Sequence, residues 1–213
     1  MERTVNYIDC IRFLAKRRTD QLVITSAGNS GQAWWAASRD AEASFYLDAS
    51  MSLSTMFASG LAFALPEFKI WSFMGDGAFC MNPGMLMVER DMDLPNLTHF
   101  LISNRRYGAT GNAGLPNQKR NDYAAIARGM GLDRVFSFDS MPALEGGFDT
   151  AVLTNAPRYT FVVLEVEPFT DVDQKLPHPP FEGPEMKYRF GRHIERITKR
   201  NIFGYELKDG HPE

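Results

Sequence analysis

Two polar residues directly follow runs of apolar and aromatic residues, at positions where buried strands would end. The run at 70–74 leads into Gly75-Asp76-Gly77, and the run at 97–103 leads into Asn104. In an open α/β sheet, ligands bind outside the carboxyl ends of the strands. We therefore expect the side chains of Asp76 and Asn104 to converge at one edge of a sheet.

A carboxylate and an amide oxygen at such an edge are suited to a magnesium ion, which prefers oxygen ligands and commonly shares them with phosphate groups. Glycines on both sides of Asp76 allow a diphosphate to approach the backbone closely. Gly-Asp-Gly alone is also compatible with an ordinary tight turn. Together with the second strand, Asn104, Tyr107 and the glycines that follow, it predicts a metal-dependent site for a phosphorylated cofactor.

The elements that must position these residues form a regular alternation. Runs with the apolar character of strands buried on both faces are separated by segments long enough for crossover helices. This pattern predicts an α/β fold with a doubly wound parallel sheet and helices on both faces. The predicted strands are 22–25, 70–74, 97–103, 134–138 and 159–166.

Helical periodicity and terminal residues predict the covering helices. Asp122 is suited to cap one helix that Gly131 ends, and Asn82 is suited to cap another with Pro83 in its first turn. The predicted helices are 5–17, 31–37, 50–65, 83–92, 123–130 and 142–154.

The character of the chain changes after Glu167, where several prolines follow within a short span. We divide the chain into one domain, 1–168, and a proline-rich C-terminal arm, 169–213. The basic, amphipathic end of the arm predicts a short helix within 186–202. Two interpretations remain open for this helix, which either contacts a partner chain or packs on its own domain.

The composition limits the classes of function. The 213 residues are 44% hydrophobic, enough to bury one core, and 23 basic against 26 acidic residues do not favour nucleic acid binding. The two cysteines are too few for a disulfide framework or a metal cluster. The charged N-terminus lacks the pattern of a signal peptide, and the longest apolar stretch is shorter than the ~20 residues that span a bilayer. We expect a cytoplasmic protein that binds neither nucleic acid nor membrane.

The candidate site resembles that of the thiamine-diphosphate-dependent enzymes, in which Gly-Asp-Gly is followed at about this distance by an Asn that ends a strand. The segments 44–52, 75–82, 96–99 and 107–111 are similar to the β subunits of sulfopyruvate decarboxylase and to the related phosphonopyruvate decarboxylases. The likeness extends over about 5–168. It implies the thiamine-diphosphate-binding fold, and within it the domain that binds the diphosphate.

The resemblance also implies roles for individual residues. Asp76 and Asn104 would bind Mg²⁺ through their side chains, and Arg106 through its main-chain carbonyl. Met51 would hold thiamine diphosphate in a bent conformation, although a core methionine on a helix is the alternative, and Thr110 would face the substrate. The expected cofactor-binding residues are Gly28, Asn29, Ser30, Ser50, Met51, Gly75, Gly77 and Ala78.

Some residues depart from the family pattern or have a structural alternative. Ser52 stands where the family usually has glycine and is expected to disturb the turn, and Ser103 replaces the first residue of a frequent Asn-Asn pair. His99 lies in mid-strand, which favours a core position over catalysis. Arg105 and Arg106 either attract an acidic substrate or point into solvent.

Thiamine catalysis requires a glutamate that hydrogen-bonds the pyrimidine ring, and in the family this residue belongs to a separate pyrimidine-binding domain. We expect 213 residues to hold only the diphosphate-binding domain. The resemblance therefore implies a separate pyrimidine-binding α subunit and a hetero-oligomer such as α2β2 or larger.

The expected function is the β subunit of a split, thiamine-diphosphate-dependent decarboxylase of a small 2-oxo acid. A sulfonate or phosphonate group on that substrate is implied by the resemblance only. Two alternatives remain open: a carboligase or acyl transferase subunit, and a non-catalytic scaffold that binds the cofactor.

Overall fold

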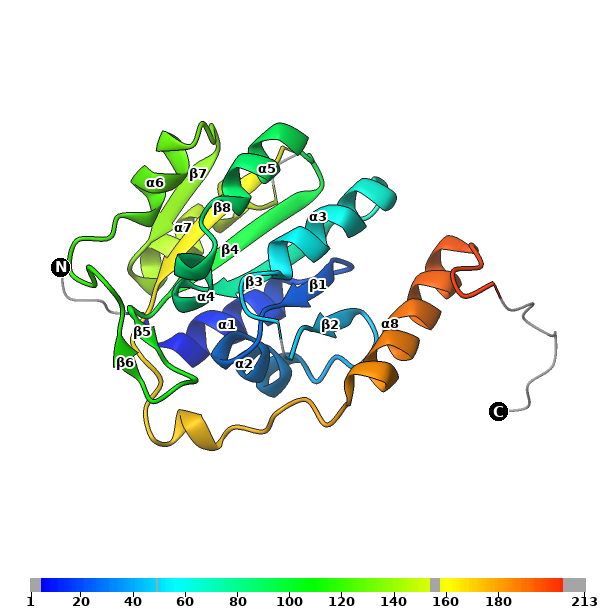
Figure 1. Ribbon diagram of the computed structural model, residues 1–213, viewed down its shortest axis with the longest axis horizontal. Coiled ribbons are helices and arrows are strands. Elements are labelled where there is room, and N and C mark those ends of the chain that lie inside the picture. The colour runs from blue at the N-terminus through cyan, green and yellow to red at the C-terminus, as the bar shows by residue number, and fades with distance from the viewer. Residues whose placement is uncertain (1–4, 49, 154–157, 205–213) are drawn as a thin grey trace.

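The computed structural model describes residues 5–48, 50–153 and 158–204, and a six-stranded parallel sheet forms its centre (Figure 1). The strand order is β2-β1-β3-β4-β8-β7. Two short strands form a separate antiparallel pair, β5 with β6. The strands are β1 (Leu22–Thr25), β2 (Ser44–Tyr46), β3 (Ile70–Gly75), β4 (Leu97–Ser103), β5 (Arg106–Tyr107), β6 (Ala113–Gly114), β7 (Val135–Phe138) and β8 (Thr160–Glu165).

Helices pack on both faces of the sheet, and each face has its own hydrophobic core (Figure 1). The prediction of a doubly wound α/β fold is therefore confirmed. One face carries α1 (Tyr7–Arg17), α2 (Asn29–Ser38) and α7 (Met141–Ala151). The other carries α3 (Ser54–Ala64), α4 (Asp76–Met81), α5 (Met85–Met92), α6 (Tyr123–Gly129) and α8 (Gly183–Thr198).

Alternate residues of the central strands supply the two cores. Trp71 and Phe73 of β3 point to the face covered by α1 and α2, whereas Ile70 and Met74 point to the face covered by α3. Phe73 stacks on Phe100 of the neighbouring strand with ring centroids 5.0 Å apart. Because both faces are buried, these strands need apolar residues at nearly every position, which is the pattern that predicted them.

Several element boundaries differ from the sequence predictions. The helix predicted at 83–92 begins at Met85, and Asn82 instead ends α4, its N–H donating to the Phe79 carbonyl at 3.0 Å. The helix predicted at 50–65 begins at Ser54, because Ser52 has a left-handed φ of 65°. Such a conformation favours glycine, the residue usual in the family that this sequence resembles. Asp122 caps α6 as predicted, accepting from the Ala125 N–H at 2.8 Å.

The C-terminal segment returns across the sheet edge formed by β2. The side-chain amide of Gln32 on α2 donates to the main-chain carbonyl of Leu176 at 2.7 Å, just after the short 3₁₀ helix η1 (Asp173–Lys175). On α8, Phe190 and Ile194 are buried against the chain's own core, and Tyr188 is exposed. Within the three described ranges, no helix is long and apolar enough to cross a membrane. Thr154, predicted to end a helix, and the arm beyond 204 lie outside those ranges.

Candidate cofactor site

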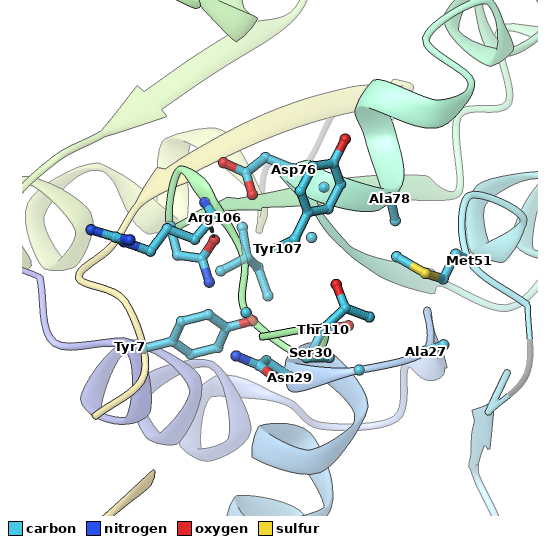
Figure 2. A pocket seen from close by; sticks show the side chains of 17 residues that line it. Tyr7, Ala27, Asn29, Ser30, Met51, Asp76, Ala78, Arg106, Tyr107 and Thr110 are labelled. Carbon is cyan, nitrogen blue, oxygen red and sulfur yellow. Dashed lines mark hydrogen bonds between the residues drawn. The ribbon is translucent and has the colours of Figure 1, made fainter. Parts of the chain in front are cut away.

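A pocket lies at the carboxyl ends of β1, β3 and β4, where the polar residues were predicted to converge (Figure 2). Its walls come from the β1–α2 loop, the start of α4 and the segment that follows β4. Ser50, expected to bind the cofactor, is not among the residues that line it. The pocket brings together the other predicted residues: Gly28, Asn29, Ser30, Met51, Gly75, Asp76, Gly77, Ala78, Asn104, Arg106 and Thr110.

Asp76, the first residue of α4, is only 1% exposed. Its Oδ2 accepts a hydrogen bond from the Arg105 N–H at 2.7 Å and lies 3.2 Å from the Ser103 hydroxyl. Its Oδ1 is buried and has no hydrogen-bond partner among the described residues. Burial raises the pKa of this carboxyl to about 6, although those hydrogen bonds oppose the rise. A buried carboxylate oxygen without a partner is unfavourable unless a donor or a cation reaches it, so this atom fits a metal site.

Two further oxygens belong to residues that line the same pocket, and with Asp76 they form a donor set that fits Mg²⁺. The Oδ1 of Asn104 accepts from the Arg106 N–H at 3.0 Å and retains a second lone pair. The main-chain carbonyl of Arg106 lies 3.7 Å from where a Cβ atom on Gly77 would be. A carboxylate and neutral amide and carbonyl oxygens are the ligands that Mg²⁺ takes beside a phosphorylated group.

The opposite wall of the pocket suits a diphosphate. The N–H groups in the first turn of α2, around Asn29 and Ser30, have no partners within their helix and attract anions. Gly28, just before this helix, has a φ of 88°, and a Cβ there would lie 3.0 Å from the Cβ of Ala109. A side chain at Gly77 would meet the ring of Tyr107 at 2.8 Å. Gly28 therefore allows the 107–109 segment to lie directly over this wall, and Gly77 allows the same segment to lie against the start of α4.

That segment narrows the pocket. Its volume is about 40 Å³, room for a few water molecules at most. A Cβ on Gly108 would lie 2.5 Å from the Nδ2 of Asn29, so the backbone here is in tight contact with the α2 wall.

Tyr7 is a pocket residue that the sequence did not indicate. It is the first residue of α1 and is 2% exposed, and Figure 2 shows its hydroxyl directed into the pocket. Burial, together with the nearby charge of Asp76, raises the pKa of Tyr7, so the phenol stays protonated and can donate. A tyrosine on the apolar side of an amphipathic helix is ordinarily a core residue, and no local motif marks this one.

Two polar residues outside the pocket have structural roles. Arg105 is 7% exposed, forms an ion pair with Glu165 and lies 4.7 Å from the ring centroid of Tyr123. Both sequence interpretations of Arg105, substrate attraction and a solvent-facing side chain, are therefore wrong. The core position predicted for His99 is confirmed, since it is fully buried with its Nδ1 3.1 Å from the Oε2 of Glu89.

The fold and the pocket define a cofactor-binding α/β domain with its ligand site at the carboxyl ends of parallel strands. The family described as "Thiamine pyrophosphate enzyme, C-terminal TPP binding domain" matches residues 27–166. The chain belongs to this family, whose cofactor is also called thiamine diphosphate.

Named relatives are β subunits, as the sequence motifs indicated. The sulfopyruvate decarboxylase subunit beta of Methanocaldococcus jannaschii is 31% identical over 158 residues, which cover 74% of this chain and 80% of that protein. The subunit of the same name from Methanococcus maripaludis is 24% identical over 188 residues, covering 88% and 97% respectively.

A solved structure of similar fold is the benzoylformate decarboxylase of Polynucleobacter necessarius. The TM-score is 0.63 at 13% identity, and the match covers 76% of this chain and 33% of that one. The chain therefore spans about a third of the length of that protein. At this identity the likeness shows the fold alone.

Proposed function

We propose that the chain is the β subunit of a split, thiamine-diphosphate-dependent decarboxylase that acts on a small 2-oxo acid bearing a sulfonate or phosphonate group. The observation that carries the proposal is the unpartnered, buried Oδ1 of Asp76 in a pocket whose opposite wall suits a diphosphate. The names of the two relatives support the decarboxylase activity and the division into subunits.

Each wall of the pocket has a role in this proposal. Asp76 and Asn104 would hold Mg²⁺ by their side chains, and Arg106 would hold it by its main-chain carbonyl. The first turn of α2 and the backbone at Gly77 would bind the diphosphate. Bound thiamine diphosphate supplies the electron sink that decarboxylation of a 2-oxo acid requires.

Met51 and Thr110 would act nearer the reacting end of the cofactor. Met51 lies in the turn before α3 rather than on a helix, is half-buried and borders the pocket (Figure 2). That place suits the role of supporting a bent cofactor. Thr110 is exposed in the segment that covers the pocket, where it would face an incoming substrate.

An exposed apolar surface on and beside α3 and α5 supports a partner subunit. Large apolar side chains on and beside α3 and α5 are exposed, among them Phe63 at 72% and Met87 at 65%. The two helices contact each other and lie side by side on one face of the sheet (Figure 1). Extended apolar patches on a protein surface mark interaction sites. We assign this surface, Leu53, Phe57, Phe63, Met81, Met87 and Val88, to the pyrimidine-binding α subunit, which would contribute the activating glutamate.

The proposal also covers the subunit composition of the complex and the role of the C-terminal arm. The complex would be α2β2 or larger and cytoplasmic. The division at residue 168 leaves an arm whose exposed Tyr188 on α8 is available to contact the partner.

The test is to isolate the native complex, identify its components by native mass spectrometry and assay CO₂ release from sulfopyruvate and phosphonopyruvate. We expect a second chain, thiamine diphosphate and Mg²⁺, and loss of turnover in Asp76→Ala. Unchanged turnover in that variant would contradict the proposal. Product formed only with an acceptor aldehyde would indicate a carboligase, and cofactor binding without any turnover would indicate a scaffold.

A further inference from the structure

Tyr7 brings a hydrogen-bond donor into the pocket from α1, which lies outside the 27–166 segment that matches the family. Its ring is held in place by packing, since it meets the ring of Phe169 edge-on with centroids 4.6 Å apart. Figure 2 shows the hydroxyl directed inward, on the same side of the pocket as Asn29. The ring of Tyr7 therefore has a packing role, and its hydroxyl remains available to bind another group.

The hydroxyl of Tyr7 differs from those of the other buried tyrosines that the structure describes. Tyr46 donates to the Asp40 carbonyl at 2.9 Å, Tyr159 donates to Glu89, and Tyr123 accepts from the Asn121 amide at 3.3 Å. No hydrogen bond joins the Tyr7 hydroxyl to another described residue, and the hydroxyl opens into the pocket. Buried tyrosines usually place their hydroxyl against a hydrogen-bond partner, so we expect this one to pair with a group bound in the pocket.

The chemistry of that group follows from the other unpaired atoms of the pocket. The Nδ2 of Asn29 is a second buried donor without a partner, and the Oδ1 of Asp76 is a buried acceptor without one. The hydroxyl of Tyr7 and the amide of Asn29 are donors on one wall and favour an anionic acceptor. The carboxylate of Asp76 on the other wall favours a cation. A metal-bound diphosphate satisfies both walls together.

We infer that the Tyr7 hydroxyl donates a hydrogen bond to a diphosphate oxygen of the bound cofactor, beside the amide of Asn29. This inference rests on the proposed cofactor site and adds to it a binding residue from α1. Tyr7 positions the diphosphate and takes no part in bond making or breaking.

Isothermal titration calorimetry of the full chain with Mg²⁺ and either thiamine diphosphate or inorganic pyrophosphate tests the inference. Tyr7→Phe keeps the ring against Phe169 and removes only the donor. We expect this variant to bind both ligands about tenfold or more weakly than the wild type, as for loss of a hydrogen bond to a charged group. Tyr46→Phe is the matched control, since it loses a buried hydroxyl that points away from the pocket, and we expect it to bind like the wild type.

The outcomes separate this inference from the proposed function. Equal affinities of Tyr7→Phe and wild type, with binding abolished in Asp76→Ala, would overturn the role of Tyr7 and leave the cofactor site intact. A wild-type chain that binds neither ligand, both alone and in complex with its α subunit, would overturn both. A purely structural role for the hydroxyl would lower the melting temperature without ligand and leave the affinities equal, so unfolding of the ligand-free variants is measured alongside.

Discussion

At the scale of single residues, the proposed metal ligand Asp76 would link metal binding to protonation. Burial raises its pKa from 3.8 to about 6, so below that pH a proton would compete with Mg²⁺ for the carboxylate. Without metal, the folded chain holds this proton more tightly than the unfolded chain does. The contribution of Asp76 to stability therefore falls as pH rises from 3.8 to about 6, and a metal ion bound to the ionised carboxylate would oppose that fall.

We expect the affinity for Mg²⁺ with pyrophosphate to fall about tenfold for each pH unit below pH ~6 and to level off above it. Calorimetric titrations at a series of pH values measure this slope, with corrections for the ionisation of pyrophosphate itself. Asp76→Asn is the control, because an amide keeps the size of the side chain and does not titrate. An affinity that is constant across this range in the wild type would show that Asp76 does not ligate the metal.

The residues of the site differ in how far sequence predicts them. Asp76 and Asn104 directly follow apolar strands, so local sequence is enough to place both at the same sheet edge. Tyr7 enters the pocket only because α1 packs beside β3 on one face of the sheet, which no local motif encodes. Arg105 was misinterpreted for a similar reason, since its partner Glu165 is distant in sequence and becomes its neighbour only when β4 pairs with β8.

At the scale of elements, buried strands and the helix capped by Asp122 were predicted well, whereas the helix expected after an Asn82 cap and the short edge elements were not. β1 and β4 have the predicted bounds, because both are buried at every position and this burial selects mostly apolar residues. β2 was missed, since three residues at a sheet edge carry too little pattern to distinguish them from a loop. The β5–β6 pair was missed for the same reason.

The turn before α3 gives a prediction at this scale. Ser52 has a φ of 65° and follows Met51, which borders the pocket. A β-branched residue is strongly disfavoured in this conformation, whereas glycine adopts it freely. We expect Ser52→Val to lower the free energy of unfolding by about 1–2 kcal/mol and to weaken cofactor binding, and Ser52→Gly to be tolerated in both respects.

Denaturant unfolding and calorimetry on the same samples measure these two effects. If Ser52→Val were as stable as the wild type, the turn would not require a left-handed residue. If it were destabilised but bound the cofactor normally, Met51 would not depend on this turn for its position.

At the scale of the whole molecule, the helices on the two faces of the sheet differ in how fully their apolar residues are buried. α1, α2 and α7 bury their apolar residues against one face, whereas α3 and α5 on the other face retain exposed ones. This exposed surface begins at Leu53, shortly after Met51, which borders the pocket that would hold the diphosphate side of the cofactor. A subunit docked there would cover this apolar surface and enclose the reacting end of the cofactor in one step.

Charged substitutions on this surface test that arrangement. Phe63 and Met87 are 72% and 65% exposed, so Phe63→Glu and Met87→Glu are expected to change the stability of the isolated chain by no more than about 0.5 kcal/mol. They should instead weaken assembly with the α subunit, measured by co-purification and native mass spectrometry, because burying a carboxylate in an apolar interface is unfavourable. Val172→Glu is the matched control, since Val172 is 75% exposed on the arm, away from α3 and α5. Assembly that resists the first two substitutions and fails with the third would assign the interface to the arm, and the surface on α3 and α5 would then need another partner.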